Sequence, residues 1–115
     1  MLTYDASHKK IVESGITALR EALFCDDTEF VRQMLFCLDF YLDPYYQNQL
    51  AYEDAVYDLL QELAVTTQSD AVAKDCFDLI GSYGFGAPLP IIEQHFDGLR
   101  EQLKPDARYV LRSGK

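Results

Sequence analysis

The chain of 115 residues has a length typical of one small domain, and 49% hydrophobic residues give it enough apolar surface for one core. Its formal net charge of −9 disfavours binding to nucleic acid and to anionic membranes. The N-terminus lacks the basic start and apolar run of a secretory signal, and no run of about 18 apolar residues could span a membrane. We therefore expect a single domain over residues 1–115 in the cytoplasm.

The negative charge is concentrated in the middle of the sequence. Residues 26–78 carry twelve acidic side chains against two basic ones, Arg32 and Lys74, which is a net charge of −10. The segments on either side are nearly neutral. Any surface with a strong negative field is therefore expected in this middle segment.

Apolar residues recur at steps of three and four, and no stretch alternates long enough to indicate a strand. The pattern predicts an all-α fold of five helices at about 5–23, 28–42, 48–65, 69–82 and 90–103, followed by a loose tail over 105–115. Gly15 is expected to be tolerated inside the first helix, and Pro105 to end the fifth. The second helix is predicted to begin at Asp27 or Thr28, and the fourth at Ser69.

The predicted helix 28–42 is apolar on more than one face, so we expect it to be central, with helices on two or more sides. It aligns with helix 69–82 at an offset of 42 residues, which places Arg32 over Lys74 and Tyr41 over Tyr83. The helices that follow align near an offset of 43. This organisation over residues 27–104 resembles HEAT repeats and implies a short right-handed α-solenoid; a compact five-helix bundle is the alternative.

No arrangement of reactive residues predicts an enzyme. His8 and His95 lack a second metal ligand at helical spacing, and His95 is expected to be buried or half-buried beside Phe96. The turn at residues 84–86 has neither the preceding strand nor the lysine of a phosphate-binding loop. We expect no catalytic residue, no metal and no cofactor. The cysteines match no zinc or redox pattern and are interpreted as small core residues, namely Cys25, Cys37 and Cys76.

A row of carboxylates beside a group of tyrosines is the candidate binding surface. Asp54, Asp58 and Glu62 recur every four residues on the predicted third helix, where like charges on one face repel. Five of the eight tyrosines lie in the same region, and tyrosine is enriched at interface hot spots, whereas carboxylates speed the approach of a basic partner. The alternative is a solvated acidic face that keeps the protein soluble. The predicted partner-binding residues are Asp43, Tyr45, Tyr46, Glu53, Asp54, Tyr57, Asp58 and Glu62.

The sequence Asp43-Pro44-Tyr45-Tyr46 is similar to the acid and Tyr-Tyr-Pro element of colicin nuclease immunity proteins, with the same residues in another order. In size, acidity and repeat-like helices, the chain also resembles small bacterial immunity proteins of contact-dependent inhibition systems. The resemblance implies an inhibitor that masks the active or substrate-binding surface of a basic cognate toxin, for which a nuclease is expected. The alternatives are a HEAT-like scaffold or adaptor and a phage-encoded acidic mimic of nucleic acid. In each case we expect no direct contact with nucleic acid or membrane.

Overall fold

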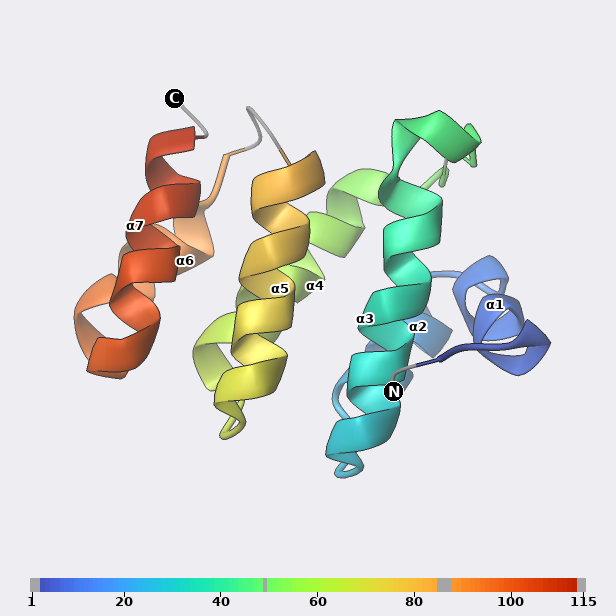
Figure 1. Cartoon of the computed structure of the whole chain (residues 1–115), viewed down its shortest axis with the longest axis horizontal. Coiled ribbons are helices and arrows are strands. Elements are labelled where there is room, and N and C mark those ends of the chain that lie inside the picture. The colour runs from blue at the N-terminus through green and yellow to red at the C-terminus, as the bar shows by residue number, and fades with distance from the viewer. Residues whose placement is uncertain (1–2, 49, 85–87, 114–115) are drawn as a thin grey trace. The chain divides into compact units, whose positions relative to one another are not determined.

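The computed structural model describes residues 3–48, 50–84 and 88–113, and the regular structure in these ranges is entirely helical (Figure 1). The predicted all-α character is confirmed, but the count of five helices is wrong. No helix in the described ranges is long and apolar enough to cross a membrane. The α-helices are α1 (Ala6–Glu13), α2 (Ile16–Leu23), α3 (Thr28–Leu42), α4 (Glu53–Thr66), α5 (Asp70–Tyr83), α6 (Pro90–His95) and α7 (Lys104–Ser113), and the 3-10 helices are η1 (Pro44–Tyr46), η2 (Phe96–Gly98) and η3 (Glu101–Leu103).

The chain forms two compact units, Met1–Val56 and Tyr57–Lys115, and α4 contains the boundary between them. In the first unit, α3 contacts both α1 and α2, in agreement with its predicted central role. The core of this unit includes fully buried aliphatic side chains from all three helices. They are Val12, Leu19, Leu23, Met34, Leu35 and Leu38.

The predicted helix 5–23 is two helices, because Gly15 breaks it. Gly15 has φ of 115° and ψ of −178°, a conformation that is essentially restricted to glycine. Immediately before it, the Ser14 hydroxyl donates a hydrogen bond at 2.7 Å to the carbonyl of Lys10, which also accepts the backbone N–H of Ser14 at 3.0 Å at the end of α1. Gly15 is therefore the N-cap of α2 and not a tolerated interior residue.

The predicted boundaries of α3 are confirmed. The Asp27 side chain accepts a hydrogen bond from the backbone N–H of Phe30 at 3.0 Å, as an N-cap residue does. The helix ends at Leu42, and the Asp43 side chain then accepts the N–H of Tyr45 at 2.9 Å, which starts η1. Asp43 thus ends one helix and organises the next turn.

Two tyrosines fasten distant parts of the first unit to the end of α1. The Tyr41 hydroxyl donates to Glu13 Oε2 at 2.7 Å, and the Tyr52 hydroxyl donates to the carbonyl of Val12. Tyr52 lies in the turn before α4, which begins at Glu53 and not at the predicted residue 48. The later start leaves the segment after η1 without α-helical structure where it is described.

The second unit begins within α4 and continues with α5, whose predicted N-cap is confirmed by a 3.2 Å hydrogen bond from the N–H of Val72 to the Ser69 hydroxyl. The helix ends before Gly84, against which the ring of Tyr57 packs. A Cβ at Gly84 would lie 3.0 Å from Tyr57 Cε1, so only glycine allows this close approach. The core of the second unit also contains the fully buried side chains of Leu60, Ile80 and Ile92.

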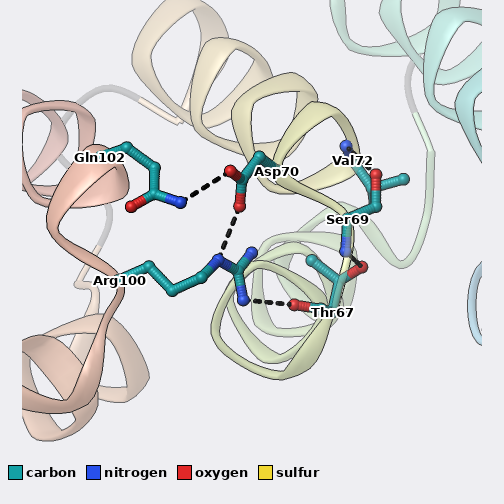
Figure 2. A network of polar contacts seen from close by, with 6 residues as sticks. All are labelled: Thr67, Ser69, Asp70, Val72, Arg100 and Gln102. Carbon is teal, nitrogen blue, oxygen red and sulfur yellow. Dashed lines mark hydrogen bonds and ion pairs between the residues drawn. The ribbon is translucent and has the colours of Figure 1, made fainter.

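The predicted helix 90–103 is wrong, because the chain leaves the helical conformation at Leu99 and Arg100, where ψ is 149° and 144°. Arg100 Nε donates to Asp70 Oδ1 at 2.6 Å, and Arg100 Nη1 donates to the carbonyl of Thr67 at 3.2 Å (Figure 2). Gln102 Nε2 donates to the other Asp70 carboxylate oxygen at 2.8 Å. These contacts hold residues 100–102 at the start of α5, where a continued helix could not place them.

The tail predicted over 105–115 is also wrong, since residues 104–113 form α7. Pro105 is the second residue of this helix, where its missing N–H removes no helical hydrogen bond. Leu103, Ala107 and Val110 recur at helical spacing and are buried, and α7 contacts α5. Pro105 therefore helps to begin a helix instead of only ending one.

Candidate protein-binding surface

Five aromatic side chains form a cluster on the surface of the first unit, which we call the aromatic patch. Its rings touch in series: Tyr4 lies edge-on to Phe36, with 5.2 Å between centroids, and 6.5 Å from Phe40. The ring of Phe40 is 4.8 Å from that of Tyr46, which meets Tyr45 edge-on at 5.3 Å. Such edge and tilted pairs stabilise one another beyond simple burial, so the rings form one continuous surface.

Three rings of the aromatic patch are exposed to solvent in large part. Tyr45 is 82% exposed, Tyr46 49% and Phe36 44%, and the described residues include only one other large hydrophobic side chain this exposed, Tyr109. Single exposed hydrophobic residues are ordinary, but a contiguous exposed group marks an interaction surface. Tyrosine in particular provides a large contact area at small entropic cost.

Local structure explains how α3 and η1 build the patch. Phe36 and Phe40 are one turn apart on α3, on the side opposite to the buried Met34 and Leu38. Proline at the first position of η1 and the Asp43 cap at its start set the backbone that carries Tyr45 and Tyr46. The turn then ends at Gln47 in the left-handed conformation, with φ of 57°.

Charged groups surround the aromatic patch. Lys9 Nζ lies 4.7 Å from the centroid of Phe40 and 5.9 Å from that of Tyr4, within the range of cation–π attraction. Asp39 lies on the same face of α3 as the two phenylalanines, Asp43 is the C-cap residue of this helix, and both are half-buried. Burial raises the pKa of the Tyr4 hydroxyl, and the nearby Cys37, Tyr46 and Asp39 raise it further.

The eight predicted partner-binding residues have different environments. Tyr45 and Tyr46 are exposed as predicted, and Asp43 caps the turn that carries them. Tyr57, in contrast, is only 7% exposed and packs against Gly84 in the core of the second unit, so little of its side chain is open to a partner. The four remaining acidic residues lie on α4, where two are exposed (Asp54 and Asp58) and two half-buried (Glu53 and Glu62).

Sequence reasoning missed Tyr4, Lys9, Phe36 and Phe40 as members of this surface. The excess of apolar residues on helix 28–42 predicts packing on several sides and does not by itself identify an exposed side. Phe36 and Phe40, four residues apart and opposite to the most buried positions, were the signal that one side of this excess faces solvent. Tyr4 carried no comparable signal, because its place beside Phe36 depends on the path of the N-terminal segment.

The structure also locates the residues considered for metal or redox chemistry. His95 is exposed, contrary to the prediction, whereas His8 is buried, and its Nδ1 accepts a hydrogen bond from the Asp5 N–H at 3.1 Å. Among the described residues, no group of three histidine, cysteine or acidic side chains could hold a metal ion. Cys37 and Cys76 are buried as predicted, and burial raises the pKa of Cys37 to about 11. Cys25 is exposed, so its interpretation as a core residue is wrong.

No protein-family model matches the chain, and no curated protein or solved structure is similar to it at a significant level. The resemblance to toxin-immunity proteins stays a prediction from sequence character. A function for this chain is therefore inferred from the chemistry of its surface, in which the aromatic patch gathers three of the four large exposed hydrophobic side chains of the described residues.

Proposed function

We propose that the protein binds a basic protein partner through the aromatic patch and inhibits it, as the immunity proteins that its sequence resembles inhibit their toxins. The observation that supports this proposal is the series of five touching rings, three of them exposed, in a chain with a net charge of −9. A partner that covers Phe36, Tyr45 and Tyr46 removes their apolar surface from water, which is the main source of binding free energy in protein interfaces.

The acidic residues supply the second part of the proposal. A stable interface buries about 800 Å² on each partner, more than a few aromatic rings provide, so a polar rim must complete it. Asp39 on α3 and Asp43 at its C-cap are near the rings, and carboxylates in this position attract lysine and arginine side chains of a partner. The exposed Asp54 and Asp58 add to the field that steers a basic protein towards the surface.

Inhibition would follow from occlusion. A nuclease binds its substrate through a basic surface, and an acidic protein seated on that surface excludes nucleic acid without any catalytic step. The specific form of the proposal is a bacterial, cytoplasmic immunity protein with a cognate nuclease toxin. The HEAT-like organisation that the sequence pattern of residues 27–104 predicts is part of the same proposal.

The test starts with capture of partners by the full chain, followed by elution along a salt gradient and mass spectrometry. We expect one dominant basic protein, whose toxicity in co-expression is suppressed by this chain. The affinity of the purified pair is then measured for Tyr45→Ala/Tyr46→Ala, which removes both rings, and for Tyr45→Phe/Tyr46→Phe, which keeps them. Loss of a hot-spot tyrosine costs about 2 kcal/mol, so the alanine pair should weaken binding at least about 30-fold and the phenylalanine pair far less.

A charge reversal tests steering separately. Asp54→Lys/Asp58→Lys should slow association, most strongly at low salt, whereas Glu93→Lys/Asp97→Lys, the same change in charge at exposed positions elsewhere, should slow it less. Unchanged affinity of the alanine pair would refute the proposed surface. Several unrelated partners would instead indicate an adaptor, and a large nucleic-acid-handling complex would indicate a nucleic-acid mimic.

A further inference from the structure

The second unit contains a pocket of about 210 Å³ between α5 and α7. The buried side chains of Phe77 and Val110 lie at its base, and the remaining lining combines an aromatic ring with two carboxylates: Tyr109, Asp78 and Asp106. None of these residues belongs to the aromatic patch or to the acidic row of α4. The pocket is therefore a separate feature that the proposed function does not use.

Gly81 determines the shape of this pocket. A Cβ at this position would lie 3.2 Å from Tyr109 Cε2, so the absence of a side chain lets the tyrosine ring rest against α5. Tyr109 is nevertheless 57% exposed, which leaves much of its ring open to solvent. The ring thus lines one side of the pocket and keeps an accessible aromatic surface.

Within the described ranges, neither Asp78 nor Asp106 forms an ion pair with a basic side chain. Although much of the Asp78 side chain is exposed, partial desolvation raises the pKa of its carboxyl group, and the charges of Asp75 and Asp106 raise it further. Lys74 offsets only part of this effect. A cation placed between Asp78 and Asp106 would relieve the repulsion.

We propose that this pocket receives an arginine side chain of the protein partner. A guanidinium group is planar, stacks on an aromatic ring and donates several hydrogen bonds in a fixed geometry, which matches Tyr109 beside two carboxylates. The aliphatic part of the side chain can lie against Phe77 and Val110. A lysine ammonium group is compact and strongly hydrated, so it uses the ring wall less well.

The inference rests on the proposed function only in taking a basic protein as the source of the arginine. Two carboxylates and one ring offer little contact area, so a lone arginine should bind weakly, with a Kd of about 1 mM or above. In a complex, the same contact gains from the other contacts that the partner makes.

The pocket can be tested without any partner by NMR titration of the full chain with N-acetyl-arginine amide. N-acetyl-citrulline amide, which has the same shape without the charge, is the control ligand. We expect salt-sensitive shifts of backbone amides at residues 78–82 and 106–110 with the arginine probe, and no comparable shifts with citrulline. Asp78→Asn/Asp106→Asn should lower the affinity for the arginine probe at least about 5-fold, whereas Glu93→Gln/Asp97→Asn should leave this affinity unchanged.

Equal shifts with both ligands, or no localised shift up to about 50 mM of the arginine probe, would show that the pocket does not bind arginine. Gly81→Ala, which pushes the ring of Tyr109 away, gives a further check, and the asparagine variants keep the test intact if this variant fails to fold. Once a partner is in hand, the Asp78→Asn/Asp106→Asn variant should bind it about 5-fold more weakly. If the arginine probe binds the wild-type chain but this variant binds the partner normally, the partner does not supply the arginine and the inference is wrong. The proposed function would still stand, because it depends on the aromatic patch.

Discussion

Replacement of Gln61 by methionine should destabilise the second unit through α6, although the two residues are similar in size. Gln61 lies fully buried on α4, and its Oε1 accepts hydrogen bonds from the N–H groups of Ile91 at 3.1 Å and Ile92 at 3.3 Å. The N-cap of α6, Leu89, provides no side-chain hydrogen bond, so the amide of Gln61 takes the place of a local cap.

The size of the effect follows from the donors that would lose their partner. A buried N–H left without an acceptor costs about 1–3 kcal/mol, and the bond to Ile92 is buried while that to Ile91 is partly exposed. Gln61 Nε2 has no hydrogen-bond partner among the described residues, so its removal returns part of this energy. We therefore expect a net loss of about 1–3 kcal/mol in the free energy of unfolding.

Urea unfolding followed by circular dichroism measures this loss, because the chain contains no tryptophan for fluorescence. Gln68→Met, at an exposed position, controls for the introduced methionine and should change stability by less than about 0.5 kcal/mol. Amide hydrogen exchange should also show faster exchange at Ile91 and Ile92 in the Gln61 variant. A Gln61→Met protein as stable as wild type would refute the capping role.

Two further substitutions test the turn at Gly15 and the network at Asp70. Gly15→Ala should lower the free energy of unfolding in urea by about 1–3 kcal/mol, because the φ of Gly15 is positive. In the control Gly98→Ala, the added Cβ also meets no atom within 4 Å, and the free energy of unfolding should change by less than about 1 kcal/mol. Equal losses in the two variants would contradict this explanation. The hydrogen bonds from Gln102 and Arg100 lower the pKa of Asp70, so the stability that its carboxylate contributes is present above about pH 4 and is lost as the pH falls towards the lowered value. The difference in melting temperature between wild type and Asp70→Asn should therefore shrink from pH 7 to pH 3, and a growing difference would show that the sign is wrong.

Local sequence was sufficient where the structure depends on neighbouring residues. The spacing of apolar residues predicted helices throughout, and Asp27 and Ser69 were recognised as N-caps because a cap bonds to an N–H three residues away. The exposure of Tyr45 and Tyr46 also followed from local sequence, since they come directly after Pro44 at the end of an apolar helix. These features need no knowledge of how the helices pack.

Tertiary structure decided the features that depend on residues far apart in the chain. Arg100 leaves the helical conformation for Asp70 and Thr67, and Gln61 caps α6, in each case across about 30 positions. Tyr57 also depends on a distant residue, because it is buried against Gly84, whereas Tyr45 and Tyr46 in the same acidic segment are exposed. Which side of an apolar helix stays exposed, as Phe36 does beside Tyr4, is set by the neighbours that cover the other sides, and a sequence pattern alone does not name those neighbours.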